Sequence, residues 1–185
     1  NVSVFETNIR VLGGLLSAHM LAADEDLGLY DEYDGALLNL AVDLGTRLLP
    51  AFDTATGIPY GTVNLRYGVP PLETAVASLA GGGSVSLEFA VLSALSGNPV
   101  FGDKGRQAAR GLFERRSRGR GLLGKHVYVQ TGKWVEALSG IGSNSDSFYE
   151  YLAKMYALFG DDDDWAMFLE TYEAVVTYAA NGDWY

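Results

Sequence analysis

A glutamate and an arginine near the start of the chain have the spacing of one helical turn. They are Glu6 and Arg10 in the stretch SVFETNIRVLGGLLSAH, and on a helix they would share one face. Ser3 and Glu6 also fit a capping box, in which the glutamate only stabilises the start of a helix. The alternative is a carboxylic acid at the mouth of a pocket, placed to exchange a proton with a substrate. The spacing alone leaves both interpretations open.

A second pair of acids lies four residues apart at Asp146 and Glu150. They would share a face near the start of a helix, where the positive helix end favours ionised carboxylates. A structural role is again available, since Ser147 and Glu150 fit a capping box and Glu150 is spaced to pair with Lys154. In the functional alternative, Glu6 and Asp146 come from separate helices. Such a pair suits glycoside hydrolysis, which needs one proton donor and one base for water.

Aromatic residues are dense around these acids and could either stack on sugar rings or fill the core. The set comprises Tyr60, Tyr67, Tyr128, Trp134, Phe148, Tyr149 and Tyr151. Other chemistry has little support. The sequence contains no cysteine and two histidines, which excludes thiolate chemistry and disfavours a histidine-centred nucleophile.

Six stretches with helical periodicity must position these residues. They form three pairs, spanning 4–23 and 34–49, 84–96 and 101–116, and 146–159 and 164–179. Long glycine-rich loops, 53–83 and 117–142, follow the first two pairs, and their segments 58–69 and 125–135 favour short strands or hairpins. The first helix of each pair carries acids near its start and few charges elsewhere, whereas the second is amphipathic.

An inner ring of buried helices inside an outer ring of amphipathic helices accounts for both patterns. The prediction is an all-α fold, an α/α toroid with short β-hairpins in its long loops. The loops would lead back to the starts of the inner helices, so that loops and acids collect at one mouth. Three hairpins cannot close a ring, and we therefore expect exposed apolar helix faces at two open ends.

Composition narrows the possible partners. The 185 residues are 48% hydrophobic and 19% charged, which is typical of a globular domain. A formal net charge of −10 disfavours broad binding to nucleic acid or anionic membranes. No apolar run approaches the roughly 20 residues of a transmembrane helix. The arginines between Arg106 and Arg120 are interpreted as the solvated face of an outer helix and its exit loop.

Several ordered blocks resemble the glycoside hydrolase family 47 α-mannosidases, and most closely the branch called ER degradation-enhancing α-mannosidase-like proteins. The blocks are NVSVFETNIRVLGGLLSAH, LLPAFDTATGIPYGTVNL, GNPVF, GLLGKHVYVQTGKW, GIGSNSDSFYEYLAK, and MFLE followed by DWY. They run through essentially the whole chain in the family's order. Taken as residues 1–185, the chain is then expected to be part of the catalytic domain, incomplete at both ends.

The resemblance implies an (α/α)7 barrel, of which this chain carries about three hairpins. It also implies inverting removal of α-1,2-linked mannose from high-mannose N-glycans, with calcium as cofactor. The implied setting is the disposal of misfolded glycoproteins in the lumen of the endoplasmic reticulum. By motif, Glu6 and Asp146 match catalytic carboxylates and Arg10 matches the arginine beside the first. Glu88 and Glu150 match acids that line the glycan pocket.

This sequence also departs from the pattern of the family at several points. The family's general base and its calcium-binding threonine lie in later hairpins, so we expect no metal ligand in this chain and no activity from it alone. Where relatives read GETPVTCTAG, residues 72–81 read LETAVASLAG, which lacks the cysteine. Asn144 stands where processing mannosidases have arginine. Two alternatives to an enzyme stay open, a lectin-like mannose-binding module and a helical scaffold whose acids only cap helices.

Overall fold

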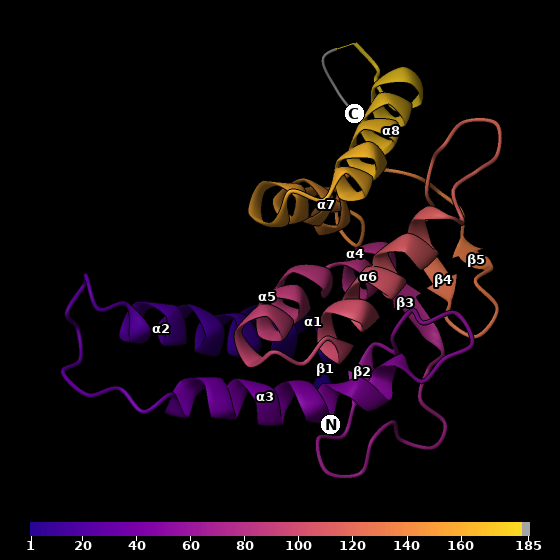
Figure 1. Ribbon diagram of the computed structural model, residues 1–185. Helices are drawn as coiled ribbons and strands as arrows, with labels where there is room; N and C mark the ends of the chain where they lie inside the picture. Colours follow the sequence, from indigo (N-terminus) through magenta and orange to yellow (C-terminus); the bar gives the residue numbers. More distant parts are fainter. Residues whose placement is uncertain (183–185) are drawn as a thin grey trace.

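Three helical hairpins form the body of the molecule, and two small antiparallel sheets lie at one end (Figure 1). The structure is a computed structural model and describes residues 1–182, so the final DWY block lies outside the described residues. The first hairpin consists of α1 (Val4–Glu6), η1 (Thr7–Leu12) and α2 (Gly13–Ala23), which run on without a break, and of α3 (Ala36–Leu48). The second pairs α5 (Ser86–Ser96) with α6 (Val100–Phe113), and the third pairs α7 (Asp146–Phe159) with α8 (Asp162–Tyr178).

All six predicted helices are confirmed, with ends that shift by at most a few residues. Two short helices were missed, η2 (Leu49–Phe52), which continues α3, and α4 (Leu79–Gly83). In α4, three consecutive glycines lower the helix propensity. Its start carries an N-cap, because the Ser78 hydroxyl accepts a hydrogen bond of 2.9 Å from the Gly81 N–H. Such a cap is the local signal that identifies a helix start.

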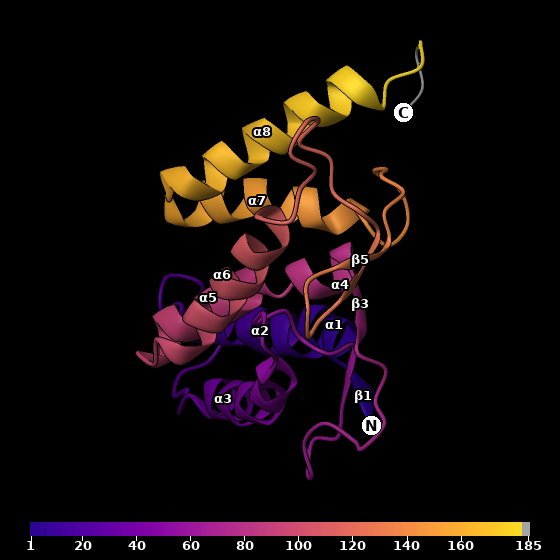
Figure 2. The same cartoon turned by 90° about the vertical axis from the view of Figure 1, so that its right-hand side faces the viewer.

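The hairpins stack in the order predicted for part of a toroid. Helix α5 contacts α2 on one side and α7 on the other, while α3 and α6 pack as the second members of their pairs (Figure 2). Phe89 lies between Phe52 and Phe101, with ring centroids 5.1 and 5.9 Å away. A second core cluster contains Phe148, which is fully buried against Gly83. The all-α toroid class is thereby confirmed.

The loops form sheets that differ in part from the predicted hairpins. Within 58–69 the prediction of short strands or hairpins is confirmed, because β2 (Thr62–Val63) is a short strand and Asn64 and Gly68 close a tight antiparallel turn. The partner of β2 was not predicted: it pairs with β1 (Val2–Ser3) at the start of the chain. Within 125–135 the prediction holds, since β4 (His126–Tyr128) and β5 (Trp134–Glu136) form a hairpin, to which β3 (Val76–Ser78) adds a third strand. Short-range patterns cannot reveal such pairings between distant segments.

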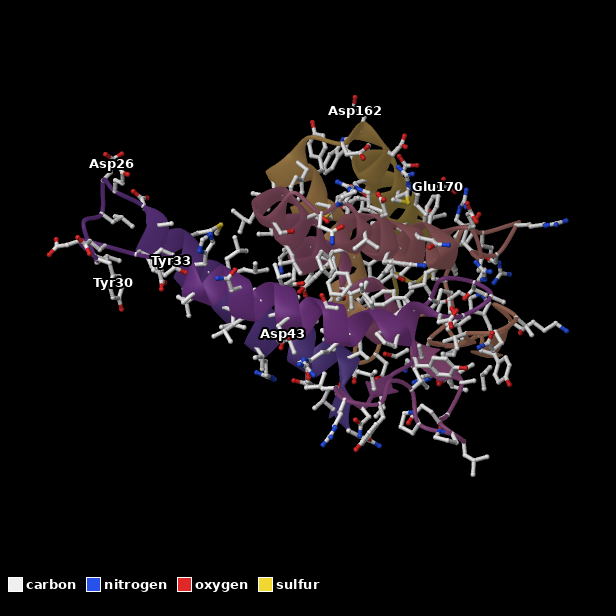
Figure 3. All side chains as sticks on the ribbon, turned by 60° about the horizontal axis from the view of Figure 1, so that its bottom comes forward. Asp26, Tyr30, Tyr33, Asp43, Asp162 and Glu170 are labelled. Carbon is white, nitrogen blue, oxygen red and sulfur yellow. The ribbon has the colours of Figure 1, made fainter. Side chains whose placement is uncertain are left out.

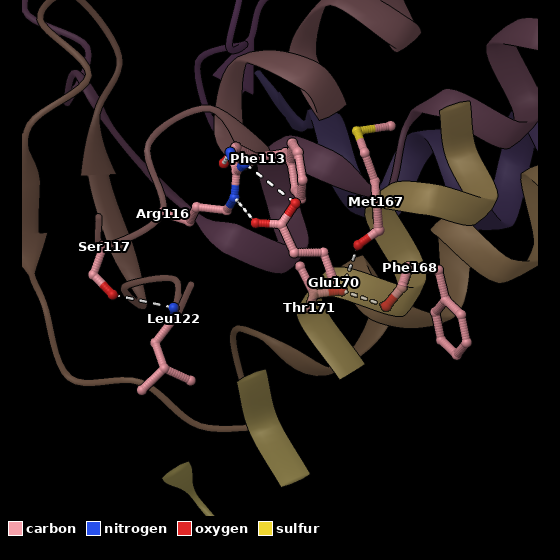
Figure 4. A network of polar contacts seen from close by, with 8 residues as sticks. All are labelled: Phe113, Arg116, Ser117, Leu122, Met167, Phe168, Glu170 and Thr171. Atoms are coloured by element: carbon pink, nitrogen blue, oxygen red, sulfur yellow. Dashed lines mark hydrogen bonds and ion pairs between the residues drawn. The ribbon is translucent and has the colours of Figure 1, made fainter. Parts of the chain in front are cut away.

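The arginine-rich stretch joins two outer helices. Arg116, just after α6, donates from Nη2 to Glu170 Oε2 on α8 at 3.2 Å, and its guanidinium lies 3.9 Å from the centroid of the Phe113 ring (Figure 4). Arg110 reaches Asp163 of α8 at 2.9 Å. These half-exposed ion pairs support the prediction that the arginines belong to a solvated outer surface.

Apolar side chains are exposed at both ends of the stack, as expected for an open ring. On the first hairpin they are Val11, Met20, Leu21 and Leu40, and on the last they include Trp165, Leu169, Tyr172 and Val176. Aromatic rings stack along α8, with Trp165 and Phe168 centroids 5.2 Å apart and Phe168 and Tyr172 centroids 5.9 Å apart. At the far end from the sheets, the α2–α3 connection projects with Asp26 and Tyr30 at its tip (Figure 3).

One stretch, Leu79–Ser96, has the length and composition of a membrane span, with a mean hydropathy of 1.3 over 18 residues. This corrects the expectation that no apolar run approaches the length of a transmembrane helix. Of this window 56% is buried inside the structure, and the chain leaves helical geometry between α4 and α5. These residues therefore form the core of the hairpin stack.

Candidate active site

The helix starts and loops converge on a hollow of about 360 Å³ at the end of the stack that carries the sheets. Phe5 and Glu6 come from α1, and Asp146, Ser147 and Glu150 come from α7, while Ser78, Ala80, Gly81, Ser143 and Asn144 complete the lining. Residues separated by more than 140 positions thus meet at one mouth. The structure brings Glu6, Asp146 and Glu150 together, as the toroid prediction required.

Glu6 is available for chemistry because its carboxylate does not cap the helix. The Ser3 hydroxyl accepts a hydrogen bond of 3.3 Å from the Glu6 backbone N–H, which is one half of a capping box. The Glu6 side chain instead accepts a hydrogen bond from Arg10 Nε. Both side chains are half exposed or more, so this pair contributes little to stability. Its effect is to hold the carboxylate in place.

Arg10 lies in an unusual helical segment. Residues Thr7–Leu12 form a π-helix within the first inner helix, and such segments occur often at functional sites. The same segment carries Asn8, whose side chain is fully buried although it is polar. Within this segment Arg10 donates to Glu6, and Asn8 Nδ2 donates to Glu88 on α5.

Asp146 begins α7 beside a constrained loop. Asn144 has a φ of +73°, a conformation that asparagine adopts more readily than most residues. Its carbonyl accepts a hydrogen bond of 2.8 Å from the Ala80 N–H of α4. The Asp146 carboxylate accepts one of 2.9 Å from the Ser147 N–H. The loop is therefore fixed to α4 two residues before the candidate catalytic acid.

The alternative in which Ser147 and Glu150 form a capping box is not realised. The N-cap position of α7 is Ser145, whose side chain makes no capping bond, and the Ser147 hydroxyl accepts a hydrogen bond of 2.8 Å from Ser84 Oγ. The predicted pair of Glu150 and Lys154 is confirmed, with 2.9 Å between Oε2 and Nζ. Glu150 consequently faces the hollow without a structural role at the helix start.

Glu88 does not line this hollow and belongs to a polar network that links all three inner helices. Its carboxylate accepts hydrogen bonds of 2.7 Å from Asn8 Nδ2 and 2.9 Å from the Tyr151 hydroxyl. Gly13 lies beside the Glu88 side chain, and a Cβ at this position would make an ordinary contact with it at 3.5 Å. Burial raises the pKa of Glu88, although both hydrogen bonds oppose that shift. Burial and the adjacent Glu88 raise the pKa of Tyr151, which keeps its hydroxyl protonated as a donor.

The raised pKa of Glu88 predicts a pH-dependent contribution to stability. An acid whose pKa is raised on folding stabilises the fold while the pH lies below its ordinary pKa of 4.5. This contribution is lost as the pH rises through the pKa of the folded state. The wild type should therefore lose unfolding free energy relative to Glu88→Gln as pH rises from about 4 to 7. Urea unfolding of both proteins across this range measures the difference. A difference that stays constant with pH would contradict the prediction.

An apolar hollow of about 380 Å³ adjoins the polar one, because both contain Asp146 and Glu150. Its wall is formed by Ile141, Tyr149, Phe168, Tyr172, Val175 and Val176. Burial raises the pKa of Tyr149 to about 12, so its hydroxyl remains neutral. The two acids thus stand between a polar mouth and an apolar wall built by α7 and α8.

The described residues do not form a site for the calcium ion that the resemblance implies. Among residues 1–182, no cluster of three or more histidine, aspartate or glutamate side chains is placed to hold a metal ion. Three polar residues near the acids were not predicted. Asn8 donates to Glu88, and Ser84 donates to Ser147, which lines the hollow. A second polar residue, beside Arg10, in the mostly apolar segment NIRVLGGLL is the signal that points to Asn8.

The fold and the grouped acids agree with the family comparison. The profile of glycosyl hydrolase family 47 matches residues 1–183, and the chain belongs to that family. It is 52% identical over its whole length to α-mannosidase I MNS4 of Arabidopsis thaliana, of which it covers 30%. It is 50% identical to human ER degradation-enhancing α-mannosidase-like protein 2, of which it covers 32%.

The fold is also similar to that of a solved structure. An α-1,2-mannosidase from Trichoderma reesei superimposes with a TM-score of 0.85 at 31% identity, over 95% of this chain and 38% of that one. The chain therefore spans about a third of the length of these relatives. The family and the fold are shown over this part.

Proposed function

We propose that the whole protein is an inverting α-1,2-mannosidase that trims high-mannose N-glycans of glycoproteins. The observation that carries the proposal is the meeting of Glu6 and Asp146 in one hollow. Carboxylates from separate helices beside a space for a sugar are the arrangement that glycoside hydrolysis requires. Family membership and relatives named as mannosidases support the same reaction.

In the proposed reaction, Glu6 and Asp146 supply the proton to the leaving glycosidic oxygen, directly or through a water molecule. Arg10 positions the Glu6 carboxylate. Glu88 and Glu150 are proposed to bind hydroxyl groups of the mannose. Glu150 lines the hollow, and Glu88 is joined to Asn8 and Tyr151 within the inner helices. We assign the base that activates water to a residue outside the described part of the chain.

The cellular role is proposed from the relatives. Their names place several of them in degradation from the endoplasmic reticulum. We infer that this protein acts in the lumen of that compartment on misfolded glycoproteins. The formal net charge of −10 suits a neutral glycan better than a polyanionic partner.

Mannose release from a high-mannose oligosaccharide by the full-length protein tests the proposal. We expect release from α-1,2-linked ends, and a loss of release when Glu6 and Asp146 are replaced by their amides. Tight glycan binding without any release would instead support a lectin-like module. Neither binding nor release would support a helical scaffold.

A further inference from the structure

A third hollow, of about 730 Å³, lies beside the loop that connects β2 to β3. The loop residues that matter are Arg66, Tyr67, Leu72 and Glu73, and Asp53 and Tyr60 complete the wall. This hollow shares no lining residue with the site that contains Glu6. It is therefore a separate surface with aromatic, acidic and basic groups.

Both ends of this loop are anchored next to the candidate active site. At one end, β2 pairs with β1, so that Thr62 lies opposite Ser3, the residue that caps Glu6. At the other end, β3 finishes at Ser78, which lines the hollow that contains Glu6. The loop thus leaves the rim of the active site and returns to it.

Local hydrogen bonds hold Tyr67 away from the core. Asn64 and Gly68 exchange backbone hydrogen bonds of 2.9 and 2.8 Å. The Asn64 side chain accepts further bonds of 2.9 Å from the Arg66 N–H and 3.0 Å from the Tyr67 N–H. The closed turn leaves Tyr67 77% exposed. A rigid exposed ring loses little conformational entropy when a ligand binds to it.

Leu72 is the second unusual residue of the loop. It has a φ of +69° and is completely exposed, two properties that are unfavourable for a branched apolar side chain. The preceding turn, closed by a hydrogen bond of 3.1 Å from the Glu73 N–H to the Pro70 carbonyl, keeps it there. Strain retained at an exposed apolar residue indicates a binding role.

The charges of this hollow select the class of ligand. Asp53 and Glu73 face it together with Arg66, whose guanidinium lies 5.3 Å from the centroid of the Tyr67 ring. Within residues 1–182, none of these three side chains takes part in an ion pair. Carboxylates and a guanidinium together can accept and donate hydrogen bonds to hydroxyl groups. Mixed charge beside an exposed ring suits a neutral carbohydrate.

We propose that the surface formed by Asp53, Arg66, Tyr67, Leu72 and Glu73 is a second carbohydrate subsite, which holds another arm of the branched glycan whose terminal mannose occupies the candidate active site. The proposal rests on the proposed function. It would make the protein prefer branched oligosaccharides over short linear ones.

Binding measurements on the full-length protein test this subsite. The probes are a branched high-mannose oligosaccharide and α-1,2-linked mannobiose, each titrated into wild type, Tyr67→Ala and Leu72→Gly. We expect the affinity for the branched probe to fall roughly three- to tenfold in Tyr67→Ala, with mannobiose affinity unchanged. Leu72→Gly should also lower the affinity for the branched probe, although glycine relieves the backbone strain.

The matched control is Tyr30→Ala, since Tyr30 is 67% exposed on the α2–α3 connection at the opposite end of the molecule. Unchanged affinity for the branched probe in Tyr67→Ala, or an equal loss in Tyr30→Ala, would overturn the subsite. If wild type released no mannose yet bound the branched probe through Tyr67, the hydrolase proposal would fail and the subsite would stand.

Discussion

Replacing Glu6 by glutamine in the full-length protein is expected to lower kcat for mannose release by roughly 10²- to 10⁴-fold, the range for loss of a general acid. Glutamine retains the size of glutamate but cannot donate the proton. The cap of α1 should survive, because the Ser3 hydroxyl binds the backbone N–H of Glu6 and not its side chain. Asp146→Asn should produce a loss of similar order. Initial rates on α-1,2-linked mannobiose measure both.

The matched control for these substitutions is Glu32→Gln, which removes an exposed carboxylate from the α2–α3 connection. It should leave kcat within about twofold of wild type, in line with its distance from the reacting groups. Unfolding curves of the variants should coincide with that of wild type. Full activity in Glu6→Gln and Asp146→Asn would contradict a catalytic role for both acids and leave them a purely structural one.

Replacing Phe148 by alanine is expected to destabilise the full-length protein by about 3–5 kcal/mol, the usual cost of removing a buried phenylalanine side chain. Phe148 is fully buried and packs on Gly83, and it joins α7 to the second core cluster. It lies between Asp146 and Glu150 on the same helix. Its loss should therefore also loosen the position of both acids.

Urea unfolding measures this effect, with Tyr30→Ala as the control for loss of an exposed ring. The control should change the free energy of unfolding by about 0.5 kcal/mol or less. If Phe148→Ala matched the control, the packing of α7 against α4 described above would be incorrect.

The helices and the grouping of the acids could be predicted because they depend on local periodicity. Residues 146–159 form the predicted helix to the residue, and the acids of α1 and α7 meet at the predicted mouth. The β1–β2 pairing could not be predicted, since it joins segments about 60 residues apart and each has only two strand residues. Pairing over such distances is set by the tertiary fold.

The network around Glu88 also depends on contacts between distant segments, which local sequence patterns do not predict. Glu88 could be selected by family motif, whereas its partners Asn8 and Tyr151 come from two other helices. A pattern within one helix indicates which face is buried but not which polar groups meet there. The π-helical segment Thr7–Leu12 was likewise hidden, because its residues have ordinary helical periodicity.

The anomeric form of the released mannose tests the central claim most directly. Proton NMR of α-1,2-linked mannobiose, recorded immediately after adding the full-length protein, distinguishes the first product before mutarotation. An inverting enzyme must release β-mannose first, because water attacks the face opposite the leaving group. Initial release of α-mannose would contradict the mechanism proposed for Glu6 and Asp146.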